Sequence, residues 1–480
     1  MHAIQLELML VGLGMLALLG DAFVPQLHAR RLGCALALAV AGILLYSFRL
    51  TPSDVPAFSG MVRVDALALF FARLFLLATL LVLVVTANDT EVLRTGAAAF
   101  FAIVLFAAAG MLLMASADDF FMMFVALELV TVGFYVLTSY LRGSGASLEA
   151  GVKYLTLGTL SSSFLVFGIA FVFGSTGTMN FEVLRALPAA MKDQPTFVFG
   201  AMLITAGLGF KIASVPFQMW APDVYQGAPT PAMGFLATGS KAAGFAVLMR
   251  LFLTGIFPLG GQGAELIALF AAATILYGVL GALGQRDLKR LLGYASISHG
   301  GYLMLGLAAF NQLGLGALLY YLVQDAVTML CAVLVLVGVH RATGTVTLAG
   351  LAGLHKRSPL LALALFVSMM SLAGVPPLSG ALGKFFLFGA VMQRGAVEHS
   401  YLALAAIAAI SVVIGLFFYL GVLRAAFVEP ADNDAPIPLT KSLATALVAC
   451  TVAIVLLGIF PQPLLHAAMQ TVQSLGAALP

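Results

Sequence analysis

Seven ionisable residues lie inside long apolar stretches of the chain, where a charge is unfavourable. The basic members are Arg73, Lys153, Lys211, Lys241 and Lys384, and the acidic members are Glu128 and Asp325. An ionised side chain near the centre of a bilayer costs about 2.5–3.5 kcal/mol on insertion scales. Such residues therefore usually face a partner or a wet cavity, and they usually have a function.

Five of these residues suit proton transfer. They are Glu128, Lys153, Lys211, Lys241 and Lys384. A lysine beside a carboxylate is held protonated, and a lysine whose carboxylate moves away in a dry environment releases its proton more readily. A row of such groups can pass protons when the distances between partners change. Redox chemistry would need a cofactor, and nothing in the sequence binds one.

Structural explanations compete with this chemistry at several positions. Arg73 lies close enough to the start of its apolar segment to snorkel or to pair structurally, and snorkelling alone would also explain Lys153. Glu128, in "FVALELVTVGFYVL", has apolar neighbours on both sides and cannot easily snorkel. His299, in "SISHGGY", is either a packing residue or a proton relay, since an imidazole changes its charge near neutral pH.

Two of the lysines lie beside predicted helix breaks. Lys211 begins "KIASVPFQMWAPDVYQGAPTP", which contains four prolines, and "GVPPLSG" (374–380) comes just before Lys384. Proline removes an N–H and disrupts the carbonyl four residues earlier. Freed backbone groups at membrane depth are tolerated only where they are buried in protein or line a water-filled cavity. The breaks therefore predict hydrated gaps beside Lys211 and Lys384.

The composition predicts an all-α integral membrane protein. Of 480 residues, 62% are apolar and only 9% are charged, whereas about a quarter of the residues of a soluble domain are charged. The apolar stretches are long and uninterrupted, which is typical of membrane helices and not of a membrane barrel. No connection is long enough for a soluble domain, so residues 1–480 form one polytopic membrane domain.

About fourteen membrane-spanning helices are expected. The candidate segments are 4–24, 32–50, 65–87, 96–116, 120–141, 150–174, 196–220, 231–257, 264–284, 291–310, 314–339, 359–393, 400–427 and 442–464. Segments seven and twelve are the interrupted ones, and they are five segments apart. That spacing suggests two inverted five-helix repeats, near 96–257 and 264–427, with the site at the breaks. No clear repeat of residues supports this division.

The basic residues of the connections predict the orientation. The odd-numbered connections carry twelve: Arg30, Arg31, Arg94, Arg142, Arg286, Lys289, Arg290, Arg341, Lys356, Arg357, Arg424 and Lys441. The even-numbered connections carry six: Arg49, Arg63, Arg185, Lys192, Arg250 and Arg394. The positive-inside rule places the odd connections in the cytoplasm and both termini on the periplasmic side.

The remaining composition excludes several classes of site. Cys34, Cys331 and Cys450 are isolated in apolar segments, with no spacing for zinc or an iron–sulfur cluster. No glycine-rich nucleotide-binding motif follows a strand, and a net charge of +3 is too small to suggest a nucleic-acid partner. We therefore expect no metal and no cofactor on this chain.

Three stretches carry a family resemblance. "FKIASVPFQMWAPDVYQGAPTP", "DLKRLLGYASISHGGY" and "GVPPLSGALGKFFLF" resemble signatures of the antiporter-like subunits of proton-pumping NADH:quinone oxidoreductase (respiratory complex I). These subunits are related to the large subunits of multisubunit sodium/proton antiporters. "YQGAPTP" and a lysine at 384 are similar to the N type, since the M type usually has a glutamate there and the L type carries a long lateral helix.

The resemblance implies roles for individual residues. It makes Glu128 the fifth-helix glutamate that modulates a lysine, with Lys153 on the sixth helix as its partner. Lys211 would be the central lysine, Lys241 the connecting lysine and Lys384 the lysine near the outward exit. His299 aligns with a tenth-helix position that is often polar but varied, and Asp325 stands where a neutral residue is expected.

The expected function is proton translocation within the bacterial inner membrane, driven by redox chemistry on other subunits. NADH, FMN, iron–sulfur clusters and quinone would belong to those partners, and neighbouring antiporter-like and small membrane subunits would contact this chain. The alternative is a homologous subunit of a sodium/proton antiporter or a membrane-bound hydrogenase. A structural spacer without a proton path is a third possibility, and a small-solute transporter fits less well because no solute-specific groups are visible.

Overall fold

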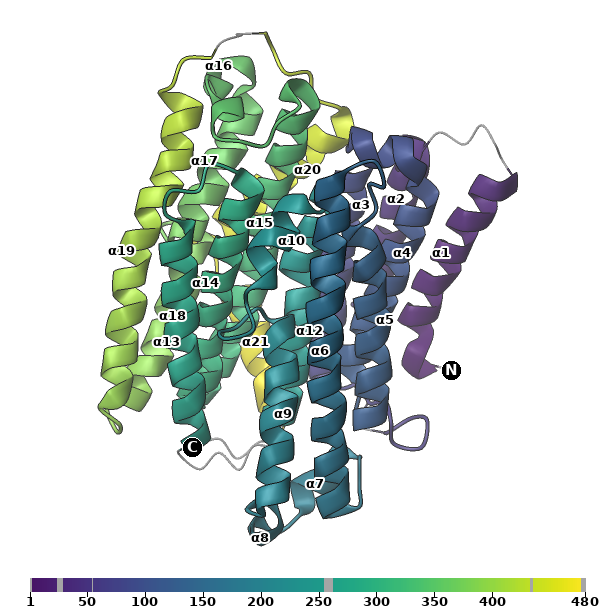
Figure 1. Ribbon diagram of the computed structural model, residues 1–480, viewed down its shortest axis with the longest axis vertical. Coiled ribbons are helices and arrows are strands. Elements are labelled where there is room, and N and C mark those ends of the chain that lie inside the picture. The colour runs from purple at the N-terminus through teal and green to yellow at the C-terminus, as the bar shows by residue number, and fades with distance from the viewer. Residues whose placement is uncertain (1, 24–28, 54, 254–261, 432–434, 476–480) are drawn as a thin grey trace.

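The protein is a bundle of long helices that run nearly parallel or antiparallel to one another (Figure 1). The computed structural model describes residues 2–23, 29–53, 55–253, 262–431 and 435–475. Apart from helices, the described residues form only four isolated β-bridges. The expected all-α class is therefore confirmed.

The helices follow one another along the whole chain. They are η1 (His2–Ile4), α1 (Gln5–Phe23), α2 (Ala29–Ser47), α3 (Ala66–Thr86), α4 (Thr90–Ser116), α5 (Phe120–Thr138), α6 (Gly145–Thr176), α7 (Phe181–Ala186), α8 (Ala189–Lys192), α9 (Pro195–Lys211), α10 (Trp220–Gly227), α11 (Thr230–Phe235), the π-helical turn η2 (Leu236–Ser240), α12 (Lys241–Leu253), α13 (Gln262–Ala282), α14 (Leu288–Ala309), α15 (Gln312–Thr343), η3 (Ala349–Leu351), α16 (Leu354–Arg357), α17 (Pro359–Ala373), α18 (Ser379–Gly395), α19 (Ser400–Phe427), α20 (Lys441–Ile459) and α21 (Gln462–Ser474).

Eleven segments within the described residues are long and apolar enough to cross a membrane, and α9 and α17 are shorter apolar helices. The integral membrane character is therefore confirmed, whereas the number fourteen stays a prediction. The predicted span at 231–257 is helical through Leu253, and its last residues lie outside the described ones.

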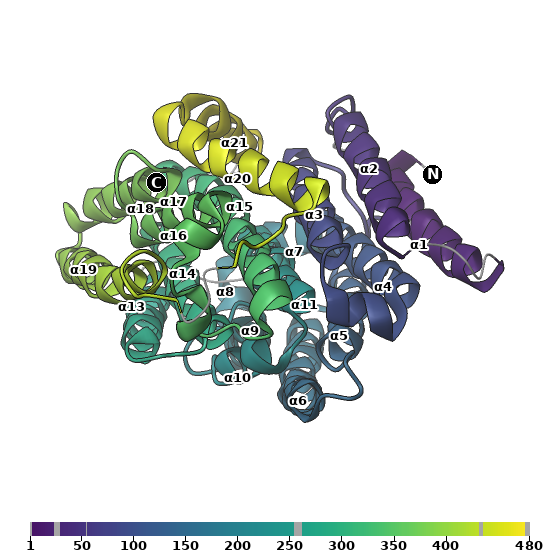
Figure 2. The same ribbon diagram turned by 90° about the horizontal axis from the view of Figure 1, so that it is seen from above.

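The central helices are apolar on every side. The α11–η2–α12 segment and α15 are almost entirely buried, whereas α1, α2 and α6 expose much of their surface. Figure 2 shows α1 and α2 at one edge of the bundle and α19 at the other, with α15 between them. A helix without a polar face is stable only in a protein core or in lipid, so this pattern places the functional residues of α12 and α15 in the interior.

The two predicted breaks are present. Helix α9 ends at Lys211 and the chain becomes helical again at Trp220, while α17 ends at Ala373 and α18 begins at Ser379. The turns that follow α9 and α17 each contain a residue with positive φ, 53° at Ala213 and 87° at Gly374. In each, the N–H of the following residue bonds the carbonyl five residues back, as in a Schellman motif.

A short repeat of sequence and geometry recurs at opposite ends of the bundle. Helices α6 and α15 both have 32 residues and end before a glycine with positive φ, Gly177 and Gly344. The following turns read "STGTMN" (175–180) and "ATGTVT" (342–347). Each turn forms one bridge, Asn180 with Asp119 and Thr347 with Asp287. Figure 1 shows α7, after the first turn, at the lower end and α16, after the second, at the upper end. The likeness is limited to Thr-Gly-Thr in the two turns, so the division into two repeats stays a prediction.

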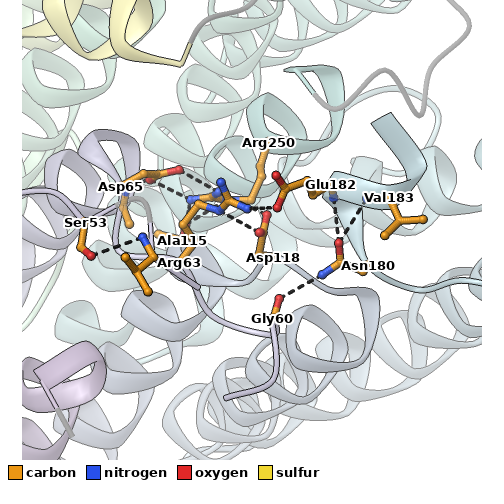
Figure 3. A network of polar contacts seen from close by, with 12 residues as sticks. Ser53, Gly60, Arg63, Asp65, Ala115, Asp118, Asn180, Glu182, Val183 and Arg250 are labelled. Atoms are coloured by element: carbon orange, nitrogen blue, oxygen red, sulfur yellow. Dashed lines mark hydrogen bonds and ion pairs between the residues drawn. The ribbon is translucent and has the colours of Figure 1, made fainter. Parts of the chain in front are cut away.

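An ion network joins four segments at the lower end of the bundle (Figure 3). Arg250 of α12 donates to both carboxylate oxygens of Asp65, each at 3.0 Å, and to the carbonyl of Ala115 at 2.6 Å. Arg63 donates to Asp118 at 2.8 Å and to Glu182 at 2.5 Å. The network fixes α12 against the starts of α3 and α5.

We predict that Arg250→Met destabilises the protein far more than Glu182→Gln. The first change leaves Asp65 buried without its partner, which costs about 3–5 kcal/mol. Glu182 is 65% exposed, so the pair it forms with Arg63 contributes about 1 kcal/mol. The midpoint of thermal unfolding in detergent measures both effects, and equal losses would contradict this account.

Candidate functional site

Lys211 is a buried lysine at the first helix break. It is the last residue of α9, and 4% of its surface is exposed. Among the described residues, its Nζ finds no hydrogen-bond partner. The carboxylate that acts on it electrostatically is that of Glu128. A buried ammonium without a partner is unfavourable, so this lysine is the one whose charge depends most on its surroundings.

Glu128 lies where α5 and α6 pack together. Its Oε1 accepts a hydrogen bond of 2.5 Å from the hydroxyl of Ser162 on α6. The neighbouring Ser161 donates to the carbonyl of Gly207 on α9 at 2.8 Å. Helix α6 therefore holds the carboxylate and also ties itself to the helix that ends in Lys211.

Lys153 does not pair with Glu128, contrary to the expectation from the resemblance. Its Nζ lies 2.7 Å from Glu149 and 2.6 Å from Asp223, and its side chain is 40% exposed. Lys153 precedes Ser162, which holds Glu128, by nine residues on α6. That separation is about 13 Å of helix rise, more than a lysine side chain spans.

Asp223 is a functional candidate that the sequence reasoning passed over. It lies on α10, and its second oxygen is 2.6 Å from Arg290 of α14. Arg290 also donates to Gln226 at 3.1 Å. The only signal for it in the sequence was a carboxylate in the middle of "WAPDVYQ", between two prolines of the break.

Lys241 forms a fully buried ion pair. It follows directly on the π-helical turn η2, and such turns often occur at functional sites. Its Nζ lies 2.6 Å from Oδ2 of Asp325 on α15, with 4% and 2% of the two side chains exposed. It also donates to the hydroxyl of Ser296 on α14 at 3.2 Å.

His299 stands next to this pair. Its Nδ1 is 3.3 Å from Oδ1 of Asp325 and 2.7 Å from the hydroxyl of Tyr321. Its Nε2 is 3.1 Å from the hydroxyl of Tyr419 on α19. The imidazole is therefore bonded through both nitrogens and contacts a carboxylate as well.

Lys384 binds the backbone carbonyls freed at the second break. Its Nζ donates to the carbonyls of Leu372 at 2.7 Å and Ala373 at 3.3 Å, which the end of α17 leaves free. The ammonium also lies 4.8 Å from the centre of the Tyr302 ring, a cation–π distance. Its electrostatic carboxylate partner is again Asp325.

The predicted residues therefore fall into three places. Lys153 lies at an exposed rim, and Lys211 and Glu128 lie at the first break. The other four gather around Asp325 of α15: Lys241, His299, Asp325 and Lys384. Helix α12 begins with Lys241 and packs against Lys211, since a Cβ built on its Gly244 would lie 3.3 Å from the Cβ of Lys211. This helix therefore links the first break to the group of residues around Asp325. No group of three or more His, Cys, Asp or Glu in the described ranges could hold a metal ion.

Residues 117–416 match the protein family described as NADH:quinone oxidoreductase/Mrp antiporter, TM. The chain belongs to this family. A curated relative, NADH-quinone oxidoreductase subunit N of Heliobacterium modesticaldum, is 38% identical over 469 residues, 97% of each chain. A relative of the same name from Moorella thermoacetica is 34% identical over 474 residues, 98% of each chain. The resemblance seen in the sequence is confirmed.

Two solved structures, each a chain of a larger complex, are similar to this chain. A chain of respiratory complex I from Thermus thermophilus with bound aureothin has a TM-score of 0.81 at 33% identity, covering 97% of this chain and 99% of that one. A chain of the Mrp complex from Dietzia sp. DQ12-45-1b has a TM-score of 0.83 at 24% identity, covering 98% of both. The second likeness shows the fold alone.

We predict that a cysteine at position 153 reacts with a membrane-impermeant maleimide roughly tenfold or more faster than a cysteine at position 241, because thiol reactivity requires exposure. The Lys153 side chain is 40% exposed and that of Lys241 is 4% exposed. The three native cysteines are replaced first, and a cysteine at Glu149, 65% exposed, is the positive control. Equal rates at 153 and 241 would contradict the geometry.

Proposed function

We propose that this chain is the proton-translocating N-type membrane subunit of a bacterial NADH:quinone oxidoreductase, driven by redox chemistry on other subunits. The observation that carries the proposal is Lys211, which is buried at the end of an interrupted helix without a bonded partner among the described residues. A lysine held in this way gains or loses its proton when the nearby carboxylate charge changes. The family membership is consistent with that role.

Glu128 controls the charge of Lys211. When the carboxylate faces the lysine, the ammonium form is stabilised, and when it turns away toward other donors, the buried amine releases its proton. Ser162 gives Glu128 such a donor on α6. The gating pair is therefore Glu128 with Lys211, in place of the Glu128–Lys153 pair that the sequence suggested.

The other residues extend the path on both sides. Asp223, held between Lys153 and Arg290, forms the cytoplasmic entrance. Lys241 receives the proton from Lys211 along α12, and Lys384 lies near the outward exit. In this path, Lys211 is the central carrier and Lys241 the connector.

The finer architecture belongs to the same proposal. Fourteen membrane spans, inverted repeats near 96–257 and 264–427, and both termini on the periplasmic side together give one domain. The turns "STGTMN" and "ATGTVT", at opposite ends of the bundle, support the inverted relation. The excess of basic residues in the odd connections supports the orientation.

The chain acts as part of an assembly and carries no redox centre in this proposal. NADH, FMN, iron–sulfur clusters and quinone bind to partner subunits, and neighbouring antiporter-like and small membrane subunits pack against this one in the inner membrane. Large apolar side chains are exposed along α1 and α2, among them Leu16 at 64% and Leu38 at 75%. Surfaces of that kind face lipid or other membrane helices.

The second candidate is a homologous subunit of a multisubunit sodium/proton antiporter or of a membrane-bound hydrogenase. The fold of the Dietzia Mrp chain is as similar as that of the Thermus complex I chain, so the fold does not separate the two functions. Neighbouring genes separate them: genes for NADH-oxidising and quinone-site subunits support our proposal, and an antiporter operon supports the alternative.

We predict that Lys211→Ala lowers proton pumping by the assembled complex roughly tenfold or more, since it removes a proton-transfer group. Quenching of a pH-sensitive dye in inverted membrane vesicles, normalised to the amount of assembled complex, measures the change. Lys192→Ala, in α8 and outside the proposed path, is the control and should pump normally. Normal pumping by the Lys211 variant would favour a subunit that only holds its partners together.

A further inference from the structure

Asp325 is buried near the middle of the long helix α15. It is thirteen residues from the start of α15 and eighteen from its end, so about 20 Å of helix separates it from the nearer end. Only 2% of its side chain is exposed. Helix α15 packs against α14, which carries His299, and against α18, which carries Lys384.

The two oxygens of Asp325 face different partners. Oδ2 is 2.6 Å from the Lys241 ammonium. Oδ1 is 3.3 Å from Nδ1 of His299, and it accepts no hydrogen bond from the part of the chain that the structure describes. The same atom is therefore a free acceptor pointed at an imidazole.

The other groups facing this carboxylate are cations and hydroxyls. Lys384 interacts with it electrostatically, as do the hydroxyl groups of Tyr225, Tyr321 and Tyr419. The described residues thus place Lys241 and His299 against a single carboxylate, with Lys384 within its electrostatic reach. One negative charge cannot hold three cations at once, so a proton gained by one site weakens the hold on another.

We propose that Asp325 is a catalytic proton-transfer residue that passes the proton of Lys241 to Nδ1 of His299. The inference rests on the proposed function, because it needs a proton to arrive at Lys241. It adds a carboxylate step to the path at a position on α15 that the family resemblance left neutral.

The step conserves charge and involves no electron transfer. The Nζ–H bond of Lys241 breaks as an O–H bond forms on Oδ2 of Asp325, which leaves a neutral amine and a neutral carboxylic acid. Rotation of the carboxyl group then brings the proton to His299, and the acid becomes a carboxylate again. The hydroxyl of Tyr321, 2.7 Å from Nδ1, turns to accept the new N–H, and Tyr419 accepts from Nε2.

The protonation of Lys384 depends on the same Asp325 charge. Its ammonium rests on two carbonyls and an aromatic ring, without a carboxylate of its own among the described contacts. An imidazolium formed at His299 draws on the charge of Asp325 that stabilises Lys384, so it favours release of the Lys384 proton. A proton entering at Lys241 is thereby coupled to one leaving at Lys384.

The test uses the assembled complex in inverted membrane vesicles, with proton uptake and NADH oxidation normalised to the amount of complex. Asp325→Asn should lower proton uptake per complex roughly tenfold, as expected for loss of a proton-transfer group. Asp325→Glu should restore at least half of it. Asp65→Asn, which also breaks a buried ion pair outside the path, is the matched control and should lower assembly without lowering pumping per complex.

The outcomes separate this inference from the proposed function. If Lys211→Ala is impaired while Asp325→Asn pumps normally, the carboxylate step is wrong and the proposed function stands. If the Lys211 variant also pumps normally, both fail. If Asp325→Asn does not assemble, His299→Gln decides, because glutamine keeps hydrogen bonds but cannot carry the proton: normal pumping overturns the step, and a loss similar to the expected Asp325→Asn loss supports it.

Discussion

An ammonium group in the membrane interior must be matched by a carboxylate, by oxygen atoms or by a place to lose its proton. The three deepest lysines of this chain use three different solutions. Lys241 has a carboxylate at 2.6 Å, Lys384 has two backbone carbonyls, and Lys211 has no bonded partner within the described residues. Of the three, Lys211 therefore loses its proton most easily, and Lys241 is held most firmly as an ammonium.

The helix breaks decide which solution each lysine receives. A break frees carbonyls that need donors, and the two breaks meet this need differently. At the end of α9 the indole of Trp220 donates to the carbonyl of Phe210 at 3.0 Å, and Tyr154 packs against both rings. At the end of α17 the donor is Lys384 itself. An aromatic residue after the first break therefore leaves Lys211 without a bonded partner, while the second break binds its lysine.

Sequence reasoning located the charged residues well but not their partners. Apolar segments, prolines and small residues are local signals, and they predicted the breaks and the burial of Lys211, Lys241 and Lys384. Partners depend on how helices lie side by side, which no local pattern records. Lys241 pairs with a residue 84 positions away, and Lys153 pairs with Asp223, 70 positions away.

The two similar turns after α6 and α15 show the same limit of local sequence patterns. Only Thr, Gly and Thr are shared at matching places in "STGTMN" and "ATGTVT", since a turn needs a glycine with positive φ and little else. The helices before the two turns both have 32 residues, and many different apolar sequences can form a helix of that length. The likeness of the two turns becomes visible because each forms one bridge in the structure, and it is hard to find in the sequence alone.

In the proposed path, the position of Asp325 also sets a direction. A proton on Lys211 has no bonded partner among the described residues, whereas a proton on Lys241 has a carboxylate at 2.6 Å, so the proposed transfer from the first lysine to the second is favourable. The same contact opposes the next departure, because the ion pair must separate in a buried site. Transfer to His299 resolves this conflict, since the imidazole lies beside the other oxygen of the same carboxylate and keeps the positive charge within its reach.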